Sequence, residues 1–215
     1  MKSLLKSTAL ATLLVVPAVA SAQEVTLSYG ATLTSRYLAS GIAQTTGAAF
    51  QPWLEVDYNG FYAGVWASNT ASAVTGSDYE IDLYAGYRNE VGMFSYDVGY
   101  ARYFYTSPSV NCCGEFILSL GVVPTDKLSL GVTLKHDPSS TTNAADAVNS
   151  SINVGYAFTD TFSMSAEYGS ISKGGHEYYS VGASYALTDT FAISASWNDT
   201  SITKDLVVVS LDVSF

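Results

Sequence analysis

The feature that most constrains this sequence is the alternation of apolar and polar residues in short segments along almost the whole chain. In 61–68 and 94–101, for example, every second residue is apolar. Side chains point alternately to the two faces of a β-strand, so the pattern predicts strands with one apolar face. The last segment keeps its register to Phe215, whereas a domain usually ends in a frayed polar tail. We expect about twelve strands, at 25–36, 50–58, 61–68, 79–88, 94–101, 116–122, 128–134, 152–158, 162–168, 179–187, 191–197 and 206–215.

The connections between these segments alternate between short and long. Asn59-Gly60 and Thr188-Asp189-Thr190 are short, and both suit tight turns, whereas 39–49, 106–114 and 136–149 are longer polar stretches. A bacterial outer-membrane barrel has this layout, with short turns in the periplasm and longer loops outside. The sequence therefore predicts an all-β fold, a transmembrane up-and-down antiparallel β-barrel, with both termini periplasmic.

Aromatic residues separate this barrel from a water-soluble β-sandwich. They recur in the apolar set next to the short turns, at one height on one face, where a membrane barrel carries its aromatic girdle. We expect the apolar face to point outward against lipid and the girdle on the periplasmic side to contain Tyr58, Phe61, Tyr87, Phe94, Phe158, Phe162, Phe191 and Phe215. A C-terminal aromatic on an alternating strand also resembles the signal that outer-membrane assembly machinery reads.

The N-terminal region predicts export. Lys2 and Lys6 precede an apolar stretch, and Ala20-Ser21-Ala22 offers a cleavage site, so we interpret 1–22 as a secretory signal peptide and 23–215 as a single barrel domain. The longest unbroken apolar run after it, 206–209, is too short for a helical membrane span. Removing the two lysines leaves seven basic against 19 acidic residues. This balance argues against nucleic acid as a partner, and we expect lipid and lipopolysaccharide instead, with Arg102 as a candidate for a lipopolysaccharide phosphate.

Four segments in the first half carry a family resemblance. They read S-R-Y-L-A-S-G-I-A-Q-T at 35–45, G-F-Y-A-G-V-W-A-S-N at 60–69, E-I-D-L-Y-A-G-Y at 80–87 and Y-D-V-G-Y at 96–100. Over about 25–123 the chain resembles the TorF family of exported, porin-like Gram-negative proteins. The first block departs from the family, which has basic residues where this chain has Leu38-Ala39-Ser40. The resemblance implies an outer-membrane porin-like protein and names no solute.

Strand parity assigns charged and aromatic residues to the inside of the barrel. The expected charged lining is Arg36, Glu55, Asp57, Glu80, Asp82, Arg88, Asp97, Lys135, Glu167 and Asp212. The expected aromatic lining is Trp53, Tyr62, Trp66, Tyr84 and Tyr103. Twelve tilted strands give a backbone diameter of about 24 Å and leave at most ~12 Å for a lumen. Seven acids against three bases favour cations, so we predict a channel for small solutes or ions; a filled, non-conducting structural or adhesive barrel is the alternative.

The remaining candidates carry weaker signals. His136 and His176 fall at strand–loop junctions in no motif of an outer-membrane hydrolase, so we expect no enzyme, and no metal or cofactor motif is present. Cys112 and Cys113 are adjacent, and a bridge between neighbours is strained. We expect no disulfide framework, with a redox or partner-linking role at a loop tip as the alternative.

Overall fold

The structure is a computed structural model that describes residues 25–106, 109–138 and 147–215, and of residues 106 and 109–113 the backbone only. The predicted signal peptide, residues 1–22, lies outside the described residues, and so do the side chains of Cys112 and Cys113.

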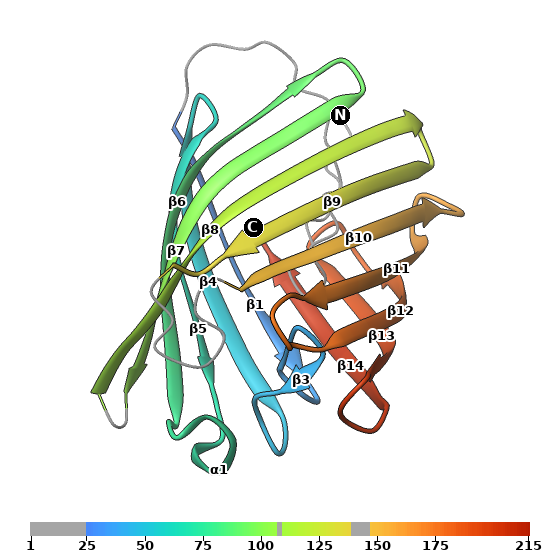
Figure 1. The fold of residues 1–215 in the computed structure, drawn as a ribbon. Coiled ribbons are helices and arrows are strands. Elements are labelled where there is room, and N and C mark those ends of the chain that lie inside the picture. Colours follow the sequence, from blue (N-terminus) through green and yellow to red (C-terminus); the bar gives the residue numbers. More distant parts are fainter. Residues whose placement is uncertain (1–24, 107–108, 139–146) are drawn as a thin grey trace.

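Twelve strands of the described chain form one closed antiparallel barrel, in the order β1-β14-β13-β12-β11-β10-β9-β8-β7-β6-β5-β4 (Figure 1). This confirms the predicted all-β, up-and-down architecture and strand number. The barrel strands are β1 (Thr26–Thr34), β4 (Ala49–Tyr58), β5 (Phe61–Asn69), β6 (Tyr79–Val91), β7 (Phe94–Thr106), β8 (Ser109–Thr125), β9 (Leu128–His136), β10 (Val148–Ala157), β11 (Phe162–Ile171), β12 (Glu177–Ala186), β13 (Phe191–Thr200) and β14 (Leu206–Ser214). A small hairpin, β2 (Leu38–Ala39) and β3 (Ile42–Ala43), and a short helix, α1 (Ser72–Thr75), lie in the long connections.

The first and last strands close the sheet. Antiparallel pairing runs from Thr34 opposite Ser210 to Gly30 opposite Ser214. Tyr29 and Phe215 continue the ladder, because each donates its backbone N–H to the carbonyl of the other, at 3.1 and 2.8 Å. Their rings also stack, with centroids 5.3 Å apart. The terminal aromatic therefore belongs to the seam that removes both free edges of the sheet.

The short turns use two local chemistries. At Asn59 and Gly60 both φ angles are positive, 54° and 84°, which is the backbone of a tight two-residue hairpin. In the turn after Ala157, the Thr159 hydroxyl accepts backbone N–H bonds from residues 161 and 162, at 3.2 and 2.9 Å. Thr188 does the same for residues 190 and 191, and Thr125 for residues 127 and 128. A threonine that satisfies two backbone donors explains why Thr-Asp recurs at this end of the barrel.

One expected loop is wrong. We predicted a long polar connection over 106–114, but β7 reaches Thr106 and β8 begins at Ser109. The two strands extend into a hairpin with a bulge, because Tyr103 pairs with Cys113 whereas Phe104 pairs with Asn111. The loop was predicted because the segment lacks apolar alternation. A hairpin that extends past the apolar zone of the barrel does not need an apolar face, because strand pairing satisfies its backbone.

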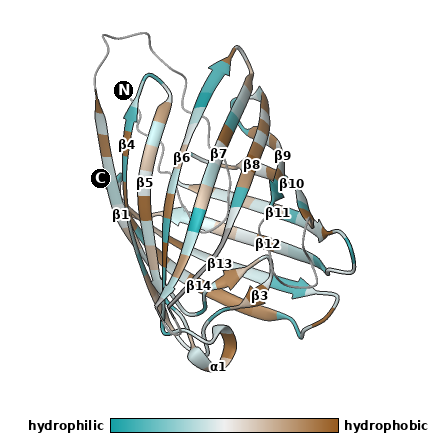
Figure 2. Ribbon diagram, turned by 60° about the vertical axis from the view of Figure 1, so that its left-hand side comes forward, coloured by the Kyte–Doolittle hydropathy of each residue, from teal (hydrophilic) through white to brown (hydrophobic). Residues whose placement is uncertain are grey.

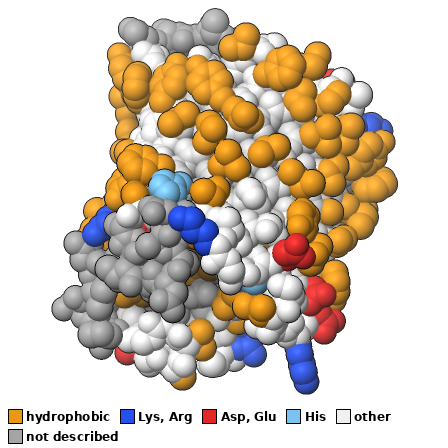
Figure 3. All heavy atoms as spheres, in the orientation of Figure 1, with side chains coloured by type: hydrophobic (Ala, Val, Ile, Leu, Met, Phe, Trp, Pro, Cys, Tyr) orange, Lys and Arg blue, Asp and Glu red, His pale blue; other side chains and the backbone are white. Residues whose placement is uncertain are grey.

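The two faces of the sheet have opposite character. Outward residues such as Leu83 and Val207 are 51% and 61% exposed, whereas most buried residues of the described chain are polar, including Thr32, Gln51 and Asp212. Figure 2 shows hydrophobic and hydrophilic bands along several strands, and Figure 3 shows apolar side chains spread over the outer wall, with most visible charged side chains in the lower half of the view. This is the reverse of a water-soluble core, in which apolar side chains are buried.

Aromatic side chains gather where strands meet the short turns. Of the predicted girdle, Tyr58, Phe61, Phe94, Phe158, Phe191 and Phe215 are all exposed. Neighbouring rings contact one another, with centroids 4.7 Å apart for Phe61 and Tyr87 and 5.6 Å for Phe158 and Phe162. In the described residues, no helix has the length and apolar character of a membrane span.

Inward tyrosines pack over glycines of neighbouring strands. A methyl group added at Gly86 would come within 2.4 Å of the Tyr62 hydroxyl and 2.6 Å of the Val98 carbonyl oxygen. At Gly64 it would meet the Tyr84 ring at 2.4 Å. These glycines make room for large side chains that lie flat along the inner wall.

We predict that Gly86→Ala destabilises the barrel, because neither the tyrosine nor the strand carbonyl can withdraw without breaking other contacts. The expected loss is about 1–3 kcal/mol in the free energy of unfolding, measured by urea titration of the refolded barrel in lipid vesicles. Gly182→Ala is the matched control, since a methyl group there comes no closer than 3.3 Å to any neighbour. Equal losses in the two variants would contradict the packing argument.

Candidate functional site in the barrel lumen

A cavity of about 540 Å³ lies inside the barrel, and polar residues of nearly every part of the wall line it. Its charged lining consists of Arg36, Glu80, Asp82, Glu115, Lys135 and Glu167. Four carboxyl groups therefore face two basic groups across the same space, and the cavity has an excess of acid.

The connection between β1 and β4 folds across this cavity. The Arg36 guanidinium donates to the Thr45 carbonyl at 3.1 Å, which braces the base of the connection. At its tip, Ser40 binds the far wall, through its carbonyl to His176 Nε2 at 2.7 Å and through its hydroxyl to Asn149 Nδ2 at 2.8 Å. The β2–β3 hairpin therefore spans the lumen at the end that carries α1 (Figure 1). The sequence predicts 39–49 only as a long connection and gives no sign that it enters the barrel.

Acidic and aromatic side chains of β5–β8 gather beneath this hairpin. We call Trp66, Glu80, Asp82, Tyr103, Tyr105 and Glu115 the acid–aromatic cluster. Asp82 is in register with Trp66 on one side and Tyr103 on the other, and Glu80 is in register with Tyr105. The Tyr105 hydroxyl donates to Glu80 at 3.0 Å, and the Tyr103 hydroxyl donates to Glu115 at 2.5 Å.

Two carboxyl oxygens of the acid–aromatic cluster lack a hydrogen-bond partner among the described residues. Among the described residues, Glu80 Oε2 and Asp82 Oδ1 are buried and have no hydrogen-bond partner. A buried polar atom without a partner costs free energy, so such an atom in a native protein marks strain, a bound water or a ligand position.

A second charged group, on β4–β7, has an arginine in direct contact with two of its acids. Arg88 forms an ion pair with Glu55, and its Nε lies 3.5 Å from Asp57 Oδ2. The guanidinium also lies over the ring of Tyr62, 4.1 Å from the centroid. The Tyr62 hydroxyl in turn donates to Asp97 at 2.6 Å. We call Glu55, Asp57, Arg88, Asp97 and Tyr62 the arginine lattice.

The remaining predicted lining residues are spread over the inner wall. Asp212 accepts a hydrogen bond from the Thr32 hydroxyl at 2.6 Å across the β1–β14 seam. Lys135 and Glu167 face the cavity from β9 and β11. Trp53 lies against Gly30 of β1, and Tyr84 against Gly64 of β5.

Sequence reasoning missed three inward residues that matter here. Glu115 has the inward parity, but it lies between the predicted loop, 106–114, and the predicted strand, 116–122. Tyr105 has the parity of the predicted inward residue Tyr103, but it lies between the predicted strand, 94–101, and the predicted loop, 106–114. Tyr37 lies in the β1–β4 connection, and its ring meets Trp66 edge-on at 5.3 Å; no periodic pattern marks it.

The two histidines do not form a recognisable catalytic arrangement. His176 binds the Ser40 carbonyl oxygen, and the buried Nδ1 of His136 has no hydrogen-bond partner within the described part of the chain. Across residues 25–106, 109–138 and 147–215, with side chains as described, no three His, Cys, Asp or Glu residues are placed to hold a metal ion.

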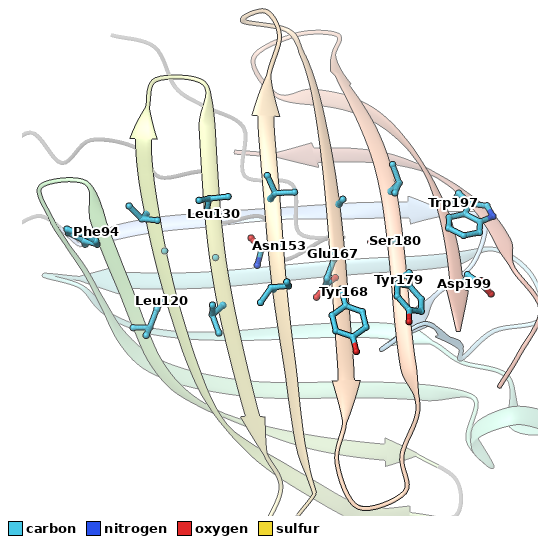
Figure 4. A pocket seen from close by; sticks show the side chains of 18 residues that line it. Phe94, Leu120, Leu130, Asn153, Glu167, Tyr168, Tyr179, Ser180, Trp197 and Asp199 are labelled. Carbon is cyan, nitrogen blue, oxygen red and sulfur yellow. The ribbon is translucent and has the colours of Figure 1, made fainter. Parts of the chain in front are cut away.

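A larger hollow of about 950 Å³ lies on the outer wall over β8–β13 (Figure 4). Outward side chains such as Leu120, Leu130 and Ile152 line it, with Tyr168 and Trp197 toward one end. Most of its lining belongs to the surrounding apolar wall, but Glu167, Tyr179 and Ser180 also line the lumen cavity.

Comparisons with known proteins agree with the fold. A family model described as a bacterial protein of unknown function (Gcw_chp) matches residues 18–213. The solved KdgM porin superposes with a TM-score of 0.63 over 87% of this chain and 98% of its own, at 13% identity. The NanC porin gives a TM-score of 0.55 over 88% of this chain and 98% of its own, at 12% identity. A comparison with curated proteins gives no match. At these identities the likeness establishes a porin-type barrel, and the TorF resemblance stays a prediction.

We predict that Arg88→Gln destabilises the barrel, because it leaves the carboxylates of Glu55 and Asp57 without their cation. The side chains of Arg88, Glu55 and Asp57 are 29%, 16% and 32% exposed and keep part of their hydration. The expected loss in the free energy of unfolding is therefore about 1–3 kcal/mol rather than the full cost of breaking a buried pair. Urea titration followed by tryptophan fluorescence measures it. Adding Glu55→Gln should recover part of the loss, and Lys127→Gln, in an exposed turn, is the control. A loss no larger than that of the control would contradict the lattice.

Proposed function

This chain belongs to the Gcw_chp family of bacterial proteins, and we propose that it is a narrow outer-membrane channel for passive diffusion of small solutes or ions, with a preference for cations. The observation that carries the proposal is the closed barrel with an apolar outside and an acidic cavity inside.

The outer surface supports membrane insertion. A closed sheet is one of two ways in which a backbone can cross hydrocarbon with its hydrogen bonds satisfied. The outward side chains are apolar over the body of the barrel and aromatic next to the short turns, as expected for a wall between two lipid–water interfaces. We place the short turns and both termini in the periplasm and the long connections outside, after export by the predicted signal peptide.

Two partners follow from this placement. The assembly machinery of the outer membrane would act on the terminal strand that ends in Phe215, and lipopolysaccharide would surround the outer rim. Arg102, whose backbone pairs with Leu83 and Gly114, remains our candidate contact for a lipopolysaccharide phosphate.

The charge of the lumen supports cations rather than anions. A solved KdgM porin is described in complex with disordered oligogalacturonate, a polyanion. In this chain Arg88 is already held by Glu55 and Asp57, and the cavity lining has four carboxyl groups against two basic ones. A ligand of that kind would meet repulsion here, because rings of Asp and Glu favour cations.

A filled, non-conducting barrel is the second candidate, and two observations favour it. The arginine lattice occupies the inner wall of β4–β7, and the β2–β3 hairpin crosses the cavity. Such a barrel would act through its surface connections, as a structural or adhesive protein. Ion conductance distinguishes the two functions, since an adhesin does not need to pass ions.

We predict that the refolded protein forms cation-preferring channels in a planar bilayer under a salt gradient. The double variant Glu80→Gln/Asp82→Asn should shift the reversal potential toward that of a non-selective pore, because it removes two carboxyl groups that line the cavity. Asp126→Asn, in an exposed short turn, removes a charge away from the lumen and should leave selectivity unchanged. Absence of conductance would favour the filled barrel, and an unaltered reversal potential in the double variant would reject these acids as the selectivity determinant.

We also predict that the hairpin limits conductance. Replacing Leu38–Ala43 by two glycines removes the segment that reaches Asn149 and His176, and should raise single-channel conductance severalfold at constant salt. His176→Gln, which changes one tether and keeps the hairpin, should have a much smaller effect. If the hairpin deletion leaves the unitary current unaltered, the narrowest part of the path lies elsewhere.

A further inference from the structure

The deepest carboxyl group of the lumen is Glu80, which is only 4% exposed. One of its oxygens accepts from Tyr105 at 3.0 Å, and the other has no partner among the described residues. Asp82, two residues along the same face of β6, also has a buried oxygen without a partner. Two neighbouring inward side chains of β6 therefore each present a buried carboxyl oxygen that has no hydrogen-bond donor among the described residues.

The hydroxyls of Tyr105 and Tyr37 lie beside Glu80 as neutral donors, so the surroundings of these acids lack positive charge. Glu115 is held by the Tyr103 hydroxyl at 2.5 Å, and Lys135 is the cation that acts on Asp82 from β9. One lysine faces the three carboxyl groups of the acid–aromatic cluster. Because a buried carboxylate needs a cation or several hydrogen-bond donors, a positively charged donor is the ligand chemistry that would complete the cluster.

The aromatic residues of the cluster further restrict the class of cation that would bind there. Trp66 and Tyr103 flank Asp82 on the neighbouring strands, and Tyr37 of the β1–β4 connection meets Trp66 at 5.3 Å. Aromatic faces next to carboxylates suit an organic ammonium group, which gains both cation–π attraction and hydrogen bonds. A directly coordinated metal ion fits less well, since the described residues offer no set of three ligands placed to hold one.

We propose that the acid–aromatic cluster is a binding subsite for the primary ammonium group of a small aliphatic amine. The ammonium would donate hydrogen bonds to Glu80 Oε2 and Asp82 Oδ1, and its alkyl chain would lie along Trp66. This inference rests on the proposed function, because the amine reaches the site through the lumen, and it names the class of solute that the channel selects.

Isothermal titration of the detergent-solubilised full barrel with butane-1,4-diamine tests the site directly. We expect saturable binding of the diamine and none of butane-1,4-diol, which has the same length without charge. Asp82→Asn and, separately, Glu80→Gln should each weaken binding at least about tenfold, because each removes one charge-assisted hydrogen bond. Glu177→Gln is the matched control, since this acid is exposed at the rim of β12 and lies outside the cavity; it should bind like the parent protein.

Circular dichroism and heat-dependent gel mobility establish that each variant is a folded barrel. If Glu80→Gln does not fold, Asp82→Asn alone tests the ammonium site. Lack of saturable binding to the parent, equal binding to all variants, or displacement of the diamine by equimolar Mg²⁺ would overturn the ammonium site. Conductance without diamine binding rejects the site and leaves the channel. Binding without conductance rejects the channel and leaves a receptor-like cavity.

Discussion

The structure depends on the pairing of its first strand with its last. Until β1 and β14 join, each of these two edge strands carries a row of unpaired backbone groups, which hydrocarbon cannot satisfy. The seam ends with the reciprocal backbone bonds of Tyr29 and Phe215, so the final aromatic residue both closes the ladder and stacks on its neighbour. Closure fixes which face is inside, and every later feature of the lumen follows from that choice.

A barrel with an apolar outside and a polar inside needs hydrogen-bond and charge partners for buried polar groups that the core of a water-soluble protein would not contain. On β4–β7 this chain uses direct contacts within the wall, since the Arg88 guanidinium serves both Glu55 and Asp57, and Tyr62 connects Arg88 with Asp97. Glycines on adjacent strands give the tyrosines room to lie along the wall. This half of the interior is therefore a packed polar core, with little free capacity for a solute.

Period-two alternation predicted most of this architecture, because in a closed sheet the parity of a residue alone decides whether it faces in or out. Glu80, Asp82 and Arg88 could be assigned inward on that basis. Parity fails where pairing is not regular: Tyr37 enters the lumen on a non-strand segment, and the bulge at Tyr103–Phe104 shifts the register of β8. The contacts of Ser40 with Asn149 and His176 join residues more than 100 positions apart, and no local pattern carries that information.

The two pairs of lumen acids, Glu55 with Asp57 and Glu80 with Asp82, have the same spacing in the sequence but different charge partners. Glu55 and Asp57 share Arg88 as a cation in direct contact, so removing Arg88 leaves both carboxylates without it and costs stability. Glu80 accepts a hydrogen bond from Tyr105 and Asp82 has Lys135 nearby, and each keeps one buried oxygen without a partner among the described residues. A protein that needed only a rigid cylinder could place neutral side chains there at lower cost, as Ser194, Ser196 and Asn198 do along β13. The uncompensated pair beneath the hairpin is therefore where a passing cation gains most from the wall, and where selection among solutes would take place.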